Sequence, residues 1–251
     1  MAGRTADVGP TVLRRAAALL GAFSAEHSEL SLAELSERTQ LPRSTAHRIA
    51  TELIGLGFLS REAGRYRLAT GLWELGELAP VSLRLRETAL PHLQTLYEAT
   101  GENVHLAVLD GAEALYVARV TGTTSIPTVT RMGGRLPLHT TGVGKALLAT
   151  RDEEWLREYF RHPLAKETVH SIIREDLLRL ELDATRRRGY AMTRGEMTLG
   201  NVSIAAALPE TQGLPRAAVG VVTHLARIDE ARIAPLVMRT AAVIGEALKS
   251  H

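Results

Sequence analysis

The sequence predicts an α+β protein in which a helical N-terminal part is joined by a short helix to a larger part built on an antiparallel sheet. Two observations lead to this class. Apolar residues recur at helical spacing up to Leu56, and from Asn103 the spacing changes to the alternation that is typical of strands. We therefore expect domains at residues 1–69 and 81–251, with a linker helix at 70–80 that ends in a proline.

Composition places the chain among ordinary globular proteins. It has 251 residues, of which 45% are hydrophobic and 23% charged, so both parts can bury a core. The absence of cysteine excludes disulfides, thiol catalysis and cysteine-bound metals. The first ten residues lack the apolar run of a signal peptide, and no stretch approaches the roughly 18 apolar residues of a membrane span. We therefore expect a cytoplasmic protein with no membrane partner.

Positive charge is concentrated near the N-terminus. Residues 1–70 hold nine Lys and Arg against seven Asp and Glu, whereas the remainder holds 21 of each. Between Arg38 and Arg67 there are six arginines and only two carboxylates, Glu52 and Glu62. Such an excess indicates an anionic partner for this segment, although a charge cluster is more often a solvated face.

Helical patterns follow one another in the N-terminal part. The first covers about 11–25, where apolar residues recur at helical spacing. The second begins at Ser31, which can form a capping box with Glu34, and runs for about two turns. The third begins at Pro42, whose missing N–H costs nothing at the first helical position, and ends at Gly57.

The third helix has an apolar and a polar face. The predicted inner face consists of Ala46, Ile49, Leu53, Ile54 and Leu56. The outer face, rich in hydrogen-bond donors, consists of Arg43, Ser44, His47, Arg48 and Thr51. Strand-like pieces at 58–61 and 65–68 then flank a turn, and strand alternation points Tyr66 and Leu68 inward on a basic hairpin.

Two helices, a turn, a third helix and a basic hairpin make the layout of a winged helix-turn-helix. A helix fits the major groove of DNA, where its exposed side chains read base edges, and hairpin arginines neutralise phosphates or enter the minor groove. The predicted base-reading residues are Arg43, Ser44, Thr45, His47 and Arg48, and the predicted hairpin contacts are Arg61, Arg65 and Arg67. The alternative is a three-helix domain with a polar surface that binds proteins.

Helices and strands alternate in the C-terminal part. A long helix is predicted over 81–100, with Gly101 at its end. Strands at 104–109 and 114–120 flank the hairpin turn Asp110-Gly111. Thr150 and Glu153 predict a second capping box, at the start of a helix that runs to about residue 160. The remaining expected elements are strands at 190–194, 201–208 and 217–223, and helices at about 174–188 and 229–248.

Nucleotide and metal motifs are incomplete. The run Gly142-Val143-Gly144-Lys145 has His139 where a P-loop needs its first glycine, and Ala146 where it needs a hydroxyl. A Rossmann fingerprint would need glycine where Leu147 stands. No two histidines have H-x-x-x-H spacing, although His105, His139 and His224 are able to converge in the fold. We therefore expect neither a cofactor nor a metal.

Catalytic motifs are also incomplete. The sequence has no G-x-S-x-G nucleophile elbow. Glu196 and His139 remain open as an acid/base pair, because nothing in the sequence places them together or apart. Three arginines at 186–188 suit a helix C-terminus, with a phosphate site as the lesser interpretation. We expect no catalytic residues; an enzyme with an accessory helical domain and a protein-interaction module are the rival classes.

Three segments carry a resemblance that spans about residues 12–248. They are LAELSERTQLPRSTAHRIATELIGLGFL with the hairpin GRYRLATGLWELG, then GGRLPLHTTGVGKALLA, and finally RRRGYAMTRGEMTLGNVSIAAAL. With them the chain resembles the isocitrate-lyase-regulator (IclR) family of bacterial transcription factors. The resemblance implies a winged helix-turn-helix, a linker helix and a GAF- or profilin-like effector-binding domain. It also implies dimers or dimers of dimers on a partly palindromic operator, and of the family's repressors and activators we expect a repressor.

The resemblance further implies an effector site. In the family, the helix start that matches Gly142 and Val143 presents backbone N–H groups to an effector's carboxylate, which agrees with anion binding at helix N-termini. Family pockets commonly add an acidic residue, a cysteine or similar small residue and two serines; these positions hold Thr193, Ser203, Gly220 and Val222. Since only Ser203 keeps comparable chemistry, we expect an effector larger or less polar than a small oxo-acid, still with one acidic group. The alternative is a pocket filled by side chains in a domain that binds no effector.

Overall fold

The computed structural model describes residues 11–122, 126 and 128–249 of the chain. The chain divides into two compact units, with the boundary between Ala79 and Pro80. Along the described ranges, no helix has both the length and the apolar character that crossing a membrane requires.

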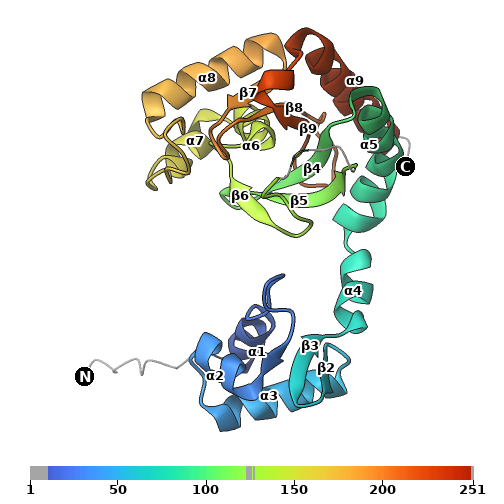
Figure 1. The fold of residues 1–251 in the computed structure, drawn as a ribbon, viewed down its shortest axis with the longest axis vertical. Coiled ribbons are helices and arrows are strands. Elements are labelled where there is room, and N and C mark those ends of the chain that lie inside the picture. The colour runs from blue at the N-terminus through green and yellow to red at the C-terminus, as the bar shows by residue number, and fades with distance from the viewer. Residues whose placement is uncertain (1–10, 123–125, 127, 250–251) are drawn as a thin grey trace, which may run out of the picture. The chain divides into compact units, whose positions relative to one another are not determined.

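The N-terminal unit consists of short helices around a small antiparallel sheet (Figure 1). Its elements are α1 (Val12–Leu20), β1 (Leu30–Ser31), α2 (Leu32–Thr39), α3 (Arg43–Gly55), β2 (Leu59–Glu62), β3 (Arg65–Leu68) and α4 (Thr70–Glu77). The strand order is β1-β3-β2. Tyr66 and residues of α1, α2 and α3 form one buried core. The predicted helix-turn-helix with a hairpin wing is therefore confirmed.

Local signals account for the helix ends. Ser31 Oγ accepts a hydrogen bond from the Glu34 N–H at 3.3 Å, and the Glu34 carboxylate accepts one from the Ser31 N–H at 2.7 Å. The predicted capping box is thus confirmed. Helix α1 is shorter than predicted, because Gly21 caps it directly after Leu20. Pro42 precedes α3 as its N-cap, one position earlier than predicted.

The buried face of α3 differs in part from the prediction. Ala46, Ile49, Ala50 and Leu53 are buried, whereas Ile54 is 36% and Leu56 64% exposed. Leu56 lies after the last helical residue, so helical periodicity no longer fixes its direction. Leu68, also predicted to point inward, is 48% exposed, although it still pairs with Leu59 in the hairpin.

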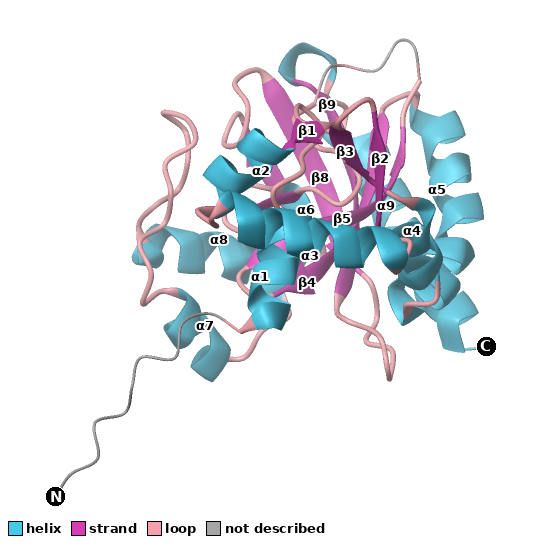
Figure 2. Ribbon diagram, turned by 90° about the horizontal axis from the view of Figure 1, so that it is seen from below, coloured by secondary structure: helices cyan, strands magenta, loops and turns pink. Residues whose placement is uncertain are grey.

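The C-terminal unit is an antiparallel sheet with helices on both faces (Figures 1 and 2). The strand order is β6-β5-β4-β9-β8-β7. The strands are β4 (Asn103–Asp110), β5 (Glu113–Val120), β6 (Arg135–Pro137), β7 (Ala191–Arg194), β8 (Asn201–Ala207) and β9 (Ala217–His224). The helices are the π-helical η1 (Val81–Arg86), α5 (Glu87–Thr100), α6 (Gly142–Ala149), α7 (Glu153–Tyr159), α8 (Glu175–Arg188), the 3-10 turn η2 (Leu225–Arg227) and α9 (Glu230–Lys249).

Each face of this sheet has its own core. Helices α5 and α9 pack on one face, around residues such as Leu93, Val219 and Ile244. Helix α6 packs on the other face, with α7 and α8 beside it, around residues such as Leu147 and Leu182. The predicted α+β class, with a mainly antiparallel sheet flanked by helices, is confirmed.

The second predicted capping box is wrong. Asp152 caps α7, because its Oδ1 accepts a hydrogen bond from the Trp155 N–H at 2.8 Å. Thr150 instead ends α6, and its hydroxyl donates to the Leu147 carbonyl at 2.7 Å. Aspartate is as good an N-cap as threonine or better. Asp152 stands directly before the first residue of α7. Helix α4 begins at Thr70, and Ala69 holds its N-cap position.

Candidate functional site

The exposed face of α3 carries the predicted base-reading residues. Arg43, Ser44, His47 and Arg48 are exposed, and Thr45 is half-buried between this face and the rest of the unit. The sequence from Arg43 to Thr51 contains no acidic residue. The result is a donor-rich ridge on a 13-residue helix, a shape that fits a major groove.

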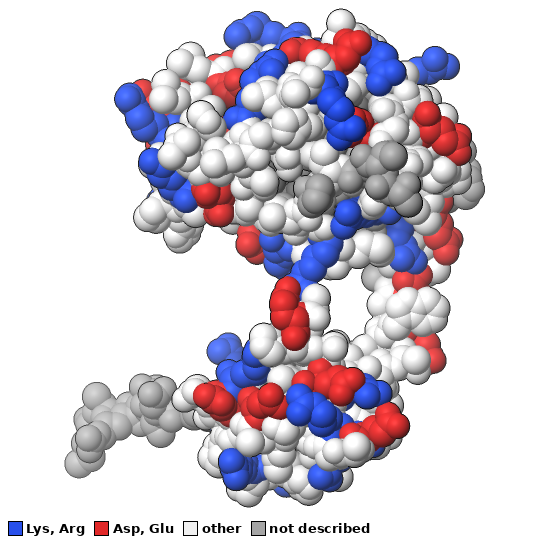
Figure 3. All heavy atoms as spheres, in the orientation of Figure 1, with Lys and Arg blue, Asp and Glu red and all other residues white. Residues whose placement is uncertain are grey.

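The wing arginines have acidic neighbours from outside the hairpin. Arg65 lies 3.7 Å from Glu29 and 3.4 Å from Glu34, and Arg67 lies 2.8 Å from Glu29 and 3.0 Å from Glu62. Pairing of β1 with β3 brings Glu29 and Glu34 beside the wing. A charge count over residues 38–67 does not include these two glutamates. Figure 3 shows acidic and basic side chains interspersed on the visible face of this unit.

Arg61 differs from the other two wing arginines. Its guanidinium lies over the ring of Tyr66, 5.3 Å from the ring centroid. This contact leaves the positive charge of the guanidinium in place, because an aromatic face carries no net charge to neutralise it.

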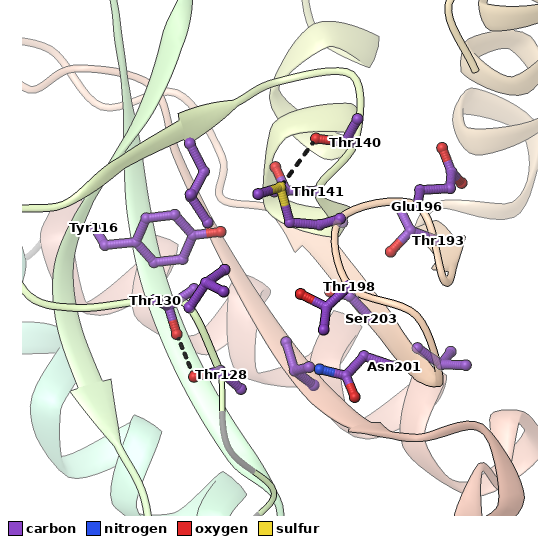
Figure 4. A pocket seen from close by; sticks show the side chains of 16 residues that line it. Tyr116, Thr128, Thr130, Thr140, Thr141, Thr193, Glu196, Thr198, Asn201 and Ser203 are labelled. Carbon is purple, nitrogen blue, oxygen red and sulfur yellow. Dashed lines mark hydrogen bonds between the residues drawn. The ribbon is translucent and has the colours of Figure 1, made fainter. Parts of the chain in front are cut away.

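A pocket of about 40 Å³ lies in the C-terminal unit, between the sheet and the start of α6 (Figure 4). Its lining mixes hydroxyl groups with apolar side chains. The hydroxyl-bearing residues include Thr128, Thr130, Thr140, Thr141, Thr193 and Ser203. The apolar residues include Leu136, Met197, Val202 and Val222, with the ring of Tyr116 on one side. Such a mixture suits a small, partly apolar ligand with polar ends.

The structure brings most of the predicted effector residues together. Gly142, Thr193, Ser203 and Val222 line the pocket. Val143 points its side chain into the core of the α6 face. Gly220 lies against that side chain, since a Cβ on Gly220 would stand 3.1 Å from Val143 Cγ1 and 2.9 Å from Ala205 Cβ. The glycine at 220 therefore makes room for the packing of α6 on the sheet.

The start of α6 has the features on which anion binding at a helix end depends. Thr141 is the N-cap, and its Oγ1 accepts a hydrogen bond from the Gly144 N–H at 3.2 Å. The amides of Gly142 and Val143 belong to the first turn, where a helix offers them no internal acceptor. A Cβ on Gly142 would stand 2.3 Å from Ser203 Oγ, so glycine allows the helix end to approach β8 this closely. The helix dipole adds positive potential at this end.

A buried ion pair holds α6 against the loop after β7. Lys145 Nζ lies 2.7 Å from Glu196 Oε1, and the two side chains are 0% and 7% exposed. Burial lowers the pKa of Lys145 and raises the pKa of Glu196, in each case against the opposing effect of the partner's charge. In Figure 4 the Glu196 carboxylate turns away from the pocket, so the pair fixes the pocket wall from behind.

The sequence left Glu196 and His139 open as an acid/base pair, but the structure pairs Glu196 with Lys145. His139 Nδ1 lies 3.2 Å from the Tyr159 hydroxyl, and its Nε2 lies 2.8 Å from the Ala165 carbonyl oxygen. Glu196 is thus engaged by Lys145 and not by His139. A signal was present in the sequence: a lysine within the apolar run GVGKALLA has to be buried with the helix and needs a carboxylate partner. In the described part of the chain, no cluster of three or more histidine or acidic side chains could hold a metal ion.

A second buried polar group lies on the pocket side of β4 and β5. His105 is 1% exposed, and its Nε2 lies 2.8 Å from Thr130 Oγ1. Thr130 Oγ1 in turn lies 2.7 Å from Thr128 Oγ1. Burial, together with the nearby charge of Arg119, lowers the pKa of His105 to about 3. The imidazole is therefore neutral at physiological pH.

Family models match both units of the chain. Residues 12–63 match the IclR helix-turn-helix domain. Residues 79–245 match the C-terminal domain of the bacterial transcriptional regulator IclR.

Curated relatives are similar over most of their length. The Pca regulon regulatory protein of Pseudomonas putida is 31% identical over 225 residues, which cover 89% of this chain and 77% of the relative. The transcriptional repressor IclR of Escherichia coli (strain K12) is 31% identical over 226 residues, which cover 88% and 82%.

Solved structures are similar over nearly the whole chain. An IclR homolog from Microbacterium hydrocarbonoxydans, complexed with 4-hydroxybenzoate, has a TM-score of 0.90 and 29% identity, and the match covers 96% of this chain and 100% of that one. The Thermotoga maritima IclR has a TM-score of 0.76 and 29% identity, with 94% and 98% covered.

The buried ion pair predicts an asymmetric effect of mutation on stability. Lys145→Met leaves the Glu196 carboxylate buried without its cation, so we expect the free energy of unfolding to fall by about 3–5 kcal/mol. The double variant Lys145→Met/Glu196→Leu removes both charges and should regain most of that loss. Urea denaturation followed by circular dichroism measures both. Lys166→Met, at an exposed position, is the control and should stay within about 0.5 kcal/mol; a single variant as stable as this control would contradict the assignment.

His105 predicts a pH-dependent stability. Its pKa falls from 6.5 to about 3 on folding, so between these values the unfolded chain binds more protons and stability falls as the pH falls. From pH 7.5 to pH 5 we expect wild type to lose on the order of 2 kcal/mol more than His105→Phe, at about 1.4 kcal/mol per pKa unit. Urea unfolding at the two pH values tests this, with His162→Phe as an exposed control. Parallel losses in wild type and His105→Phe would refute it.

Proposed function

Because the chain belongs to the IclR family of bacterial transcriptional regulators, we propose that it represses transcription from a partly palindromic operator and that a carboxylate effector modulates this binding. The chain is a DNA-binding regulator with an effector-binding C-terminal domain, and not an enzyme. The observation that carries the proposal is the exposed, donor-rich stretch Arg43–Thr51 of α3, which contains no acidic residue, within a helix-turn-helix. Since the target is chromosomal DNA, we place the protein in the bacterial cytoplasm.

In this proposal α3 enters the major groove. Arg43, Ser44, Thr45, His47 and Arg48 read base edges, because they lie on one face of a helix that fits the groove. The wing residues Arg61, Arg65 and Arg67 contact phosphates or the minor groove. Of these, Arg61 contributes most, since Arg65 and Arg67 already neutralise glutamates of their own unit.

Self-association places two such helices on one operator. Apolar side chains are left exposed on α4 and directly after it, where Trp73 and the C-cap residue Leu78 are each 66% exposed. Leu13 of α1 is exposed as well. We infer that these surfaces contribute to a homodimer, or to a dimer of dimers, with half-sites one or more helical turns of about 34–36 Å apart. Sedimentation as a monomer at micromolar concentration would contradict this.

The effector is proposed to be a carboxylic acid with a larger, less polar body than glyoxylate or pyruvate. Its carboxylate would accept hydrogen bonds from the amides of Gly142 and Val143. The apolar residues of the lining, among them Val222, favour an apolar body. The Microbacterium homolog complexed with 4-hydroxybenzoate supports an aromatic acid.

Such a ligand needs more space than the present cavity of about 40 Å³. Met197 can provide this space. Its side chain lines the pocket and is held by the Thr140 hydroxyl, whose Oγ1 lies 3.4 Å from the sulfur. An unbranched thioether turns aside at little cost, and we propose that it does so when the effector enters.

The reading face predicts the effect of losing one arginine. Arg48→Ala should weaken operator binding by about 1–3 kcal/mol, as expected for loss of a bidentate contact to a base. Fluorescence anisotropy with DNA from the protein's own upstream region, at moderate salt, measures this. Arg61→Ala is the matched comparison: it should weaken binding to all duplexes alike and lower the slope of log affinity against log salt by about one. An Arg48→Ala protein that binds the operator like wild type would refute the reading role of Arg48.

The effector site predicts a ligand-specific thermal shift. At a concentration of 100 times its Kd, a bound acid adds about 2.7 kcal/mol of stability, so 4-hydroxybenzoate and similar aromatic acids should raise the Tm by several degrees. Gly142→Ala should abolish the shift, because the added Cβ would stand 2.3 Å from Ser203 Oγ. This variant should still bind operator DNA. If only glyoxylate- or pyruvate-sized acids gave a shift, the proposed effector class would be wrong.

A further inference from the structure

The wall of the pocket remote from α6 carries a chain of hydrogen-bonded polar groups. Thr128 Oγ1, Thr130 Oγ1 and His105 Nε2 follow one another at 2.7 and 2.8 Å. In Figure 4, Thr128 and Thr130 lie across the pocket from Thr140 and Thr141, the residues that lead into α6. Both ends of the pocket are therefore polar, with apolar side chains between them.

A local irregularity in the sheet builds this chain. The register of β4 against β5 shifts between Leu106 and Ala107, so Ala107 pairs with Tyr116 while His105 pairs with Arg119. Because residues paired across two strands share a face, the shift keeps Tyr116 and Arg119 on the same side as His105. The rings of His105 and Tyr116 meet edge to face at 5.6 Å between centroids.

Burial fixes the inner members of the chain in place. His105 and Thr130 are buried, and the Arg119 guanidinium donates a hydrogen bond from Nη1 to the Thr130 carbonyl at 2.9 Å. Thr128 is only half-buried and lines the pocket. The outer end of the chain, at the Thr128 hydroxyl, thus faces the ligand space, and the inner end is a neutral imidazole.

The tautomer of His105 decides what Thr128 offers to a ligand. If Nε2 is unprotonated, it accepts from the Thr130 hydroxyl, which then accepts from Thr128, and Thr128 keeps lone pairs to accept from the ligand. If Nε2 carries the proton, each donor direction reverses and the Thr128 hydroxyl is free to donate. Either arrangement is uncharged, so the chain can match the donor or the acceptor of an uncharged group but cannot neutralise an ion.

We propose that Thr128, backed by Thr130 and His105, binds an uncharged hydroxyl at the end of the effector remote from its carboxylate. This inference rests on the proposed carboxylate site at Gly142 and Val143. It narrows the effector class to hydroxylated carboxylic acids whose two polar groups stand on opposite ends of an apolar body.

The test compares matched acids with and without the hydroxyl. Isothermal titration calorimetry of the full-length protein uses two pairs, 4-hydroxybenzoate with benzoate, and trans-4-hydroxycyclohexanecarboxylate with cyclohexanecarboxylate. For at least one pair, wild type should bind the hydroxylated acid about tenfold more tightly, as expected for one buried hydrogen bond. Thr128→Val should reduce this preference to less than about twofold without changing the affinity for the acid that lacks the hydroxyl.

Two further variants distinguish the effect of the hydrogen-bonded groups Thr128, Thr130 and His105 from that of the pocket as a whole. His105→Phe should lower the preference although it does not touch the ligand, and its melting curve checks that it folds; Thr130→Val replaces it if it does not. Thr198→Val removes another pocket hydroxyl and should leave the preference intact. In wild type containing ¹⁵N-labelled histidine, the ring nitrogens of His105 should shift with the hydroxylated acid and not with its partner.

The outcomes separate this inference from its premise. If wild type binds both members of every pair equally, or if Thr128→Val weakens both equally, the hydroxyl site is wrong and the carboxylate site stands. If wild type binds none of the four acids, the proposed carboxylate effector fails, and the hydroxyl site fails with it.

Discussion

The ion pair between Lys145 and Glu196 is the constraint on which the pocket depends. Two charges removed from water cost several kcal/mol each, and only close, well-aligned contact offsets that cost. The 2.7 Å contact therefore holds α6 and the loop after β7 at one separation. The Glu196 carbonyl also accepts a hydrogen bond from the Ser171 hydroxyl at 2.8 Å. The helix end at one side of the pocket and the loop at another are thus positioned by contacts within the protein, with the Glu196 carboxylate turned away from the pocket.

Local chemistry made the N-terminal unit predictable from the sequence. The capping box joins residues three apart, Ser31 and Glu34, and the hairpin strands follow α3 directly. The outer face of α3 could be read from helical spacing alone. Within the predicted helices of this unit the errors lie near their ends, as at Leu56, where periodicity stops, and the short strand β1 was not predicted.

The interactions that shape the sites could not be read in the same way, because they join distant residues. Lys145 and Glu196 are 51 residues apart, and Arg65 meets Glu29 across 36 residues. Which side chains share a face of β5 depends on the register shift at Leu106 and Ala107, and the sequence carries no clear sign of it. The family resemblance predicted Gly142, Thr193, Ser203 and Val222 as residues of one site. The fold brings these four residues together around one pocket.

The two ends of the pocket differ in how mutation can reach them. The amides at the start of α6 are main-chain groups, so a substitution elsewhere in the pocket leaves them in place, and only at Gly142 itself does the close approach of Ser203 require glycine. The opposite wall consists of side chains, each of which one nucleotide change can replace. Divergence from a common ancestor would therefore keep the affinity for an acid group and change which molecular body is recognised beside it. A lineage of such proteins can then come to bind new acids without passing through a form that binds none.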